Sequence, residues 1–348
     1  MRPYVRTAIV LALAMGLVAL FLHNVDLWRV ARDIVHARPE WLALSLATSF
    51  VNLAIRSWRW QWLLRPLSPT SFGTAFRATA VGFAASSLLP ARAGELIRPY
   101  FLARQRRRAH AVTMSATGAF ATIIIERLLD VVTVLVLLAS YVFMFGRDVG
   151  AANPMLFPIL KWAGATAGAG AAGALVVLFV LAGDPERLGR TMTRLGQVLP
   201  SALAGVIARI AEKFARGLGA IRRPAALLIA LAWSFPLWLS IAVGIWAVAM
   251  AFQFAVPFTG SFLLISLLTL GVAVPTPGAI GGFHEAFRLG ATAFFGAPDA
   301  AAVGAAIVLH AFTIGPSLLL GVLFAAEEGL NLNSVRRLSG SAEQGHQA

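Results

Sequence analysis

Long apolar stretches dominate this sequence and constrain its fold more than any motif. The chain has 348 residues, of which 59% are hydrophobic and only 13% are charged, whereas soluble domains are about half apolar and a quarter charged. A helix needs about 20 apolar residues to cross the ~30 Å hydrocarbon core of a bilayer. The runs that approach or exceed this length are 8–22, 41–64, 112–145, 157–182, 225–252 and 300–326. The sequence therefore predicts an all-α polytopic integral membrane protein and excludes a soluble enzyme of ordinary composition.

Two further apolar runs, 72–90 and 258–274, end in turns rich in proline and glycine. If the first run crossed the membrane completely, the basic stretch 104–108 would lie outside, against the tendency of basic residues to stay cytoplasmic. We therefore expect a re-entrant helical hairpin from the cytoplasm, and a second one from the outer side at 258–295. Opposed hairpins in two halves of a chain are typical of inverted repeats. The predicted turn residues are Pro90, Gly94, Pro275, Pro277, Gly278 and Gly281.

The alternative makes both hairpins full crossings, so the prediction is six to eight transmembrane helices with both termini in the cytoplasm. We expect one membrane domain over residues 1–330, with repeat halves at about 41–146 and 225–328, and a polar cytoplasmic tail at 331–348. In 184–224, apolar residues recur every three or four positions with arginines between them. This pattern is typical of an amphipathic helix on the cytoplasmic membrane surface. An alternative is that the segment binds a partner protein.

Charged residues inside the apolar runs are the candidates for function. Each turn carries a Glu-x-x-Arg pair on one helix face, and the run 112–145 holds Glu126 and Asp130 four residues apart. These two carboxylates repel one another unless Arg98, Arg288 or a proton lies between them. A charge inside a bilayer is costly, so it normally faces a cavity or a partner, although a structural network of ion pairs is the alternative. The candidate lipid-binding residues are Arg92, Glu95, Arg98, Glu126, Arg127, Asp130, Glu285 and Arg288.

The segment RSWRWQWLLR ends the run 41–64 and interleaves arginines with tryptophans. Indole rings favour the depth of the lipid headgroups, and arginines there face the cytoplasm. The segment is therefore interpreted as an interfacial anchor. The sharper alternative is a basic vestibule for anionic headgroups, formed by Arg56, Arg59 and Trp60.

Enzyme and cofactor motifs fit the sequence poorly. The chain has no cysteine, and its six histidines show no metal-binding spacing. It has neither a P-loop nor a GxSxG nucleophile elbow. Glu126 and Asp130 could act as an acid and base pair on a lipid headgroup, but nothing supplies a nucleophile. We therefore expect no catalytic residues, no bound metal and no cofactor.

The motifs RSWRWQWLL, SSLLPARAGELIRPYFL, ERLLD and PTPGAIGGFHEAF occur in this order along the chain. Together they resemble the lysylphosphatidylglycerol synthase transmembrane family, also called the flippase-like family, over nearly the whole chain. The resemblance implies a bacterial inner-membrane protein related to the flippase half of the multiple peptide resistance factor, which moves aminoacylated phosphatidylglycerol between leaflets. Relatives are associated with hopanoid lipids and glycosylated lipid carriers. The family positions that it implies are Arg92, Glu95, Arg98, Glu126, Arg127, Asp130, Pro277, Gly278, Gly281 and Glu285.

Bifunctional members of that family carry a soluble aminoacyl transferase domain after the membrane domain, whereas only a short tail follows the last predicted helix here. We therefore expect no synthase activity. The expected function is binding and translocation of a phospholipid or lipid-linked headgroup, anionic or zwitterionic, between the leaflets. The net charge of +14 is assigned to membrane topology rather than to a nucleic-acid partner. The alternatives are an enzyme or accessory subunit in lipid-headgroup modification, in a hopanoid, aminoacyl-lipid or glycolipid pathway, and a scaffold for lipid-synthesis enzymes.

Overall fold

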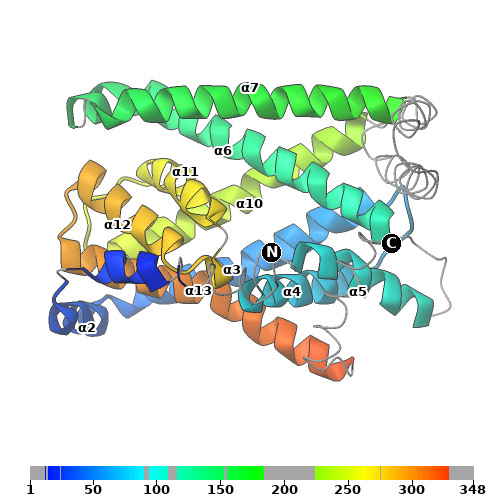
Figure 1. The fold of residues 1–348 in the computed structure, drawn as a ribbon, viewed down its shortest axis with the longest axis horizontal. Coiled ribbons are helices and arrows are strands. Elements are labelled where there is room, and N and C mark those ends of the chain that lie inside the picture. The colour runs from blue at the N-terminus through cyan, green and yellow to red at the C-terminus, as the bar shows by residue number, and fades with distance from the viewer. Residues whose placement is uncertain are drawn as a thin grey trace.

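The computed structural model describes residues 12, 15–23, 25–89, 94–108, 116–152, 155–183, 224–274 and 276–328. Within these residues every regular element is a helix, which confirms the all-α prediction (Figure 1). The predicted surface segment up to residue 223, the tail, and Pro90, Arg92 and Pro275 lie outside the described residues. The helices are α2 (Leu27–His36), α3 (Pro39–Leu64), α4 (Phe72–Leu88), α5 (Gly94–Arg108), α6 (Ala116–Ala152), α7 (Leu156–Gly183), α10 (Pro224–Ala251), α11 (Gly260–Ala273), η3 (Pro277–Ala279), α12 (Gly282–Phe295) and α13 (Asp299–Glu327).

Helix length and composition bear on which helices can cross a bilayer. Among the described residues, Leu227–Ala251 and Asp299–Glu327 are long and apolar enough to do so. α11 is equally apolar but has only 14 residues, which at 1.5 Å per residue extend about 21 Å. α3 has 26 residues, but it carries arginines in its second half.

Two short helix pairs occupy different ends of the molecule. α4 packs on α5, where a side chain at Gly94 would collide with the Gly82 carbonyl oxygen. α11 packs on α12 in the same way, since a side chain at Gly271 would collide with the Gly282 carbonyl oxygen. Glycine is needed at these crossings because only a residue without a Cβ lets two backbones approach so closely. We call α4 with α5 the first helix pair and α11 with α12 the second.

α13 runs past both helix pairs and fixes their orientation. Its first residue, Asp299, pairs with Arg288 of α12, and its last residue, Glu327, pairs with Arg77 near the start of α4. Its 29 residues extend about 43 Å, so the open ends of the two pairs lie far apart (Figure 1).

The tips of the two pairs meet between these open ends. The tip of the first pair is at Ser87 and Gly94, and that of the second is the turn 276–281. A Cβ built on Gly278 would lie 3.4 Å from the Ser87 carbonyl oxygen. The two helix pairs are therefore opposed, tip to tip.

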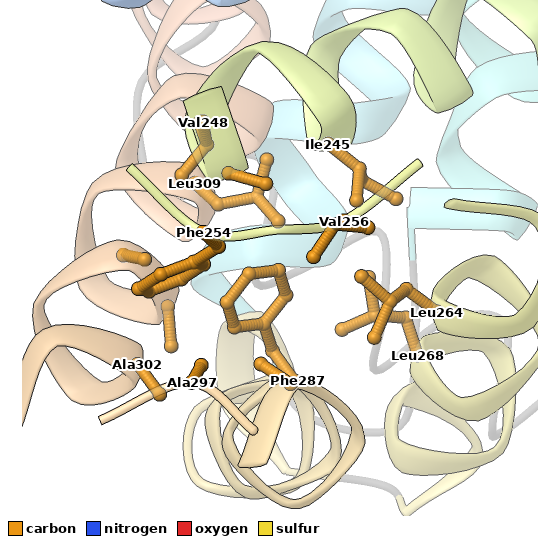
Figure 2. Close-up of a cluster of buried hydrophobic side chains, with 14 of the residues drawn as sticks. Ile245, Val248, Phe254, Val256, Leu264, Leu268, Phe287, Ala297, Ala302 and Leu309 are labelled. Carbon is orange, nitrogen blue, oxygen red and sulfur yellow. The ribbon is translucent and has the colours of Figure 1, made fainter. Parts of the chain in front are cut away.

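The main apolar core lies between α10 and the second helix pair. It gathers side chains from α10, α11, α12 and α13 and from the loop after α10. Figure 2 shows Phe287 of α12 in its centre, with Phe254 on one side and Leu264 and Leu268 on the other. Burial of this apolar surface holds the second pair firmly to the body of the protein.

α3 and α10 lie antiparallel through the middle of the protein. The Arg38 amide at the start of α3 donates to the Ala251 carbonyl at the end of α10, and Arg59 near the other end reaches Ser234. α2, which the sequence analysis did not predict, precedes α3. Asp26 caps it by accepting from the amides of Trp28 and Arg29. Its apolar residues are interrupted by Arg29, Arg32 and Asp33, so they do not stand out as a continuous run.

Candidate functional site

One face of α3 carries arginines into the protein interior. Arg56, Arg59 and Trp60 are all buried, and the buried positions continue one turn later at Leu63 and Leu64. Spacings of three and four residues place these side chains on one helix face. The prediction that Arg56 and Arg59 face the cytoplasm at the interface is therefore wrong, because this face packs against α6 and α10.

Two carboxylates from α6 meet these arginines. Arg59 lies between them, with its Nη1 2.6 Å from Asp130 Oδ1 and its Nη2 3.5 Å from Glu126 Oε1. Arg98 of α5 donates to the other oxygen of Glu126 at 2.7 Å. The sequence predicts Arg98, Arg288 or a proton between the two carboxylates, but in the structure Arg59 fills that position and Arg98 contacts Glu126 beside it.

Neutral side chains that the sequence analysis did not select complete the coordination. The Trp238 indole N–H donates to Asp130 Oδ1 at 3.1 Å, and Arg59 donates to Ser234 Oγ at 2.7 Å. The Arg98 guanidinium stacks on the Trp60 ring, 3.8 Å from its centroid, and the Trp60 indole N–H donates to Thr122 Oγ1. A cation over an indole face is stabilised by the ring electrons. The network is therefore held from α3, α5, α6 and α10.

The remaining charged groups are held more loosely. Arg127 lies 3.6 Å from Asp130 and 3.9 Å from Glu95, and Arg56 lies 3.7 Å from Asp130. Nη1 of Arg56 and Nη2 of Arg98 have no hydrogen-bond partner among the described residues. The charge cluster, as we call this set, consists of Arg56, Arg59, Glu95, Arg98, Glu126, Arg127 and Asp130. Its arginines outnumber its carboxylates by one, so it carries an excess positive charge with unused guanidinium N–H groups.

A cavity of about 500 Å³ opens beside the charge cluster. Arg56, Arg98 and Arg127 line one part of it, and Thr276 and Gly278 at the tip of the second helix pair line another. Apolar side chains from α6, α10, α11 and α13 contribute much of the wall. Ligand pockets in proteins have this size and this mixture of apolar wall and a few polar groups.

The tip of the second pair has an unusual backbone. Gly278 and Gly281 have φ angles of 60° and 87°, in the region that favours glycine, and Ala279 also has a positive φ of 57°. His310 of α13 contacts the Gly278 carbonyl oxygen through Nε2 at 2.7 Å. The centroids of the His284 and His310 rings lie 4.4 Å apart, and the Gly281 amide donates to Nδ1 of His284. The sequence motif PTPGAIGGFHE pointed to this turn, but nothing in it indicated the contact with His310.

Glu285 and Arg288 lie apart from the charge cluster. Arg288 makes two hydrogen bonds to the Asp299 carboxylate, at 2.7 and 2.9 Å, and a third to the Phe21 carbonyl oxygen. Glu285 is a weaker partner at 3.7 Å. The structure therefore joins Glu95 and Arg98 of the first turn with the charged residues 126–130 of α6 in one site, while Arg288 of the second turn ties α12 to the start of α13.

These features define a class of protein: a helical bundle that contains helices long and apolar enough to span a membrane, with a basic, apolar-walled cavity between two opposed helix pairs. The family model described as the lysylphosphatidylglycerol synthase TM region matches residues 7–321, and the chain belongs to this family. A search of curated proteins finds no match. The family match confirms the resemblance seen in the sequence motifs. It also identifies the chain as a membrane protein from a family associated with lipid headgroups.

Proposed function

We propose that this protein binds the headgroup of a membrane lipid in the cavity and carries it between the leaflets of the bacterial inner membrane. The observation that carries the proposal is the excess positive charge on one part of a cavity whose wall is otherwise largely apolar. A lipid has the same two parts, an ionic headgroup and an apolar body. The charge cluster would receive the ionic part, and the apolar wall would tolerate the start of the acyl chains.

The opposed helix pairs support an inverted arrangement of two re-entrant hairpins. α11 and α12 have 14 residues each, so each extends about 21 Å and is short for a bilayer core of about 30 Å. Half-length helices with free ends near the middle of the membrane hold polar groups in many transporters. Arg104 at the far end of α5 favours the cytoplasmic side for the open end of the first pair, with both termini cytoplasmic.

The contacts in the charge cluster suggest a division of roles. Arg59 and Arg98 are fixed by short contacts to Asp130 and Glu126, and we assign them to holding the site together. Arg127 and Arg56 make only longer contacts, so their guanidinium groups can turn toward an anion at little cost. The carboxylates balance most of the positive charge when no anion is bound, and this lowers the free-energy cost of burying the site inside a membrane.

The experiment is leaflet transfer of fluorescent lipids in liposomes that contain the purified protein. Arg127→Gln is the informative variant, since the Arg127 side chain is 36% exposed and its loss costs little packing. Arg77→Gln is the matched control, because Arg77 is similarly exposed and pairs with Glu327 at the open end of the first pair. We expect transfer by the wild type and by Arg77→Gln and a loss of at least tenfold in Arg127→Gln.

Other outcomes of this assay point elsewhere. No transfer of any lipid by folded wild-type protein would refute translocation. Product formation in a headgroup-modification assay would then favour the enzyme or accessory role. Equal transfer by both variants would agree with translocation but would show that its site lies outside the charge cluster.

A further inference from the structure

The face of α3 that carries Arg56 continues along the cavity as a row of polar side chains. Thr48 and Ser49 donate their hydroxyl protons to the Ser45 carbonyl oxygen, at 2.7 and 3.3 Å. Asn52 donates its amide N–H groups to the Leu237 carbonyl oxygen and to Ser240 Oγ, at 3.0 and 3.1 Å. A hydroxyl or amide whose protons are already donated offers a ligand only lone pairs. This part of the wall therefore presents hydrogen-bond acceptors.

The same pattern recurs on the other elements that line the cavity. Thr269 of α11 donates to the Ile265 carbonyl oxygen, and Thr276 at the tip of the second pair donates to that of Ile280. On α13, Thr313 donates to the Leu309 carbonyl oxygen. Hydroxyls bonded to their own helix are ordinary in isolation. Here they come from separate elements and line one cavity, so a ligand there meets acceptors on several sides.

A ligand that matches these acceptors must carry several O–H or N–H donors. An ammonium group would supply N–H donors, but it would need a counter-charge in this apolar setting. Among the described lining residues the carboxylates are Glu95 and Asp130, and both already lie within 4 Å of arginines. The lining arginines make the cavity positive overall, which disfavours a cation. A polyol supplies donors without charge.

We infer that the headgroup is an anionic phosphate that carries a neutral polyol, either a glycerol or a sugar. The phosphate binds the guanidinium groups of Arg56 and Arg127, and the polyol hydroxyls donate to the acceptors on α3, α11 and α13. This inference rests on the proposed function and narrows its substrate to one chemical class.

The test measures binding of short-chain lipids to the full-length protein in detergent by native mass spectrometry. The probes are phosphatidylglycerol and phosphatidylinositol, which carry polyols, phosphatidic acid, which has the phosphate alone, and phosphatidylethanolamine and lysyl-phosphatidylglycerol, which carry amines. We expect both polyol lipids to bind at least tenfold more tightly than either amine-bearing lipid. Equal binding of amine and polyol lipids would overturn the inference but leave the proposed function standing. Absence of binding by every probe would overturn both.

A pair of isosteric substitutions isolates the acceptor groups. The double variant Thr269→Val with Thr313→Val removes two acceptors and preserves side-chain shape. We expect about tenfold weaker binding of phosphatidylglycerol, since each neutral hydrogen bond contributes a few-fold in affinity. Binding of phosphatidic acid should be unchanged, which also shows that the site is folded. Thr133→Val is the control, because Thr133 is buried and bonded to its own helix in the same way but is not among the residues that line the cavity. An equal loss for both lipids in the double variant would contradict the polyol assignment.

Discussion

Replacing Glu126 with glutamine should destabilise the protein far more than breaking an exposed ion pair of the same length. Glu126 is fully buried, and its two oxygens lie 2.7 Å from Arg98 and 3.5 Å from Arg59. Two unit charges about 4 Å apart attract by about 4 kcal/mol at an effective dielectric constant of about 20. Removing one partner of a buried pair costs about 3–5 kcal/mol, because the other charge stays buried. We therefore expect Glu126→Gln to lower the free energy of unfolding by about 3–5 kcal/mol.

The double variant tests whether charge balance is the cause. Arg98→Met alone should be destabilising for the same reason, but together with Glu126→Gln it removes one charge of each sign. The excess of one positive charge in the charge cluster is then restored. The double variant should therefore lose less free energy of unfolding than the two single variants lose in sum, with a coupling energy on the order of 2 kcal/mol.

The assay is reversible unfolding of the purified protein by SDS in mixed micelles. Glu327→Gln is the control, because Glu327 pairs with Arg77 at the same 2.7 Å but the two side chains are 55% and 41% exposed. Its cost should be about 0–1 kcal/mol. If Glu126→Gln costs no more than Glu327→Gln, or if the two charge-cluster variants are simply additive, the argument from burial and charge balance is refuted.

Two further predictions address the turn and the topology. Gly281→Ala should destabilise by at least about 1–3 kcal/mol in the same unfolding assay, because Gly281 has a φ of 87° and a Cβ there would collide with Leu17. Gly73→Ala, at an open helical position, should instead be neutral or stabilising. Equal losses of stability in the Gly73 and Gly281 variants would show that the backbone conformation of Gly281 does not cause its destabilisation. The chain has no cysteine, so Ser71→Cys and Pro298→Cys, at exposed sites by the open ends of the two helix pairs, each give one labelling site. An impermeant thiol reagent should label the Ser71→Cys variant only from the cytoplasmic side of membrane vesicles and the Pro298→Cys variant only from the outer side. Labelling of both variants from the same side would contradict the inverted arrangement.

The sequence was sufficient to find the carboxylates of the charge cluster but not their main partner. Glu126 and Asp130 stand out because charges are rare in an apolar run. The alternation of tryptophan and arginine around Arg59 instead predicts an interfacial anchor or a basic vestibule for headgroups, because such alternation is typical of the membrane interface. The correct signal was the spacing of Arg56, Arg59 and Trp60, which continues the buried face of α3.

The second turn shows a different limit of sequence reasoning. Its Glu-x-x-Arg matches that of the first turn, yet Arg288 is held by Asp299, eleven residues later at the start of the next helix. Local spacing cannot reveal such a partner. The hydroxyl groups of the cavity were equally hidden, because a single serine or threonine in an apolar helix is unremarkable until separate helices bring several of them to one cavity.

α13 contacts both helix pairs, and a proline inside it separates the two sets of contacts. His310 holds the tip of the second pair, whereas Gly321 packs against Ala80 of the first. Pro316 lies between these two contacts inside the helix, and proline has no N–H to donate to the carbonyl four residues earlier. The hydrogen bonding of α13 is therefore weakest near Pro316, and each helix pair contacts α13 on a different side of this residue. Bending near Pro316 would change the angle between the pairs while leaving the glycine crossing within each pair intact.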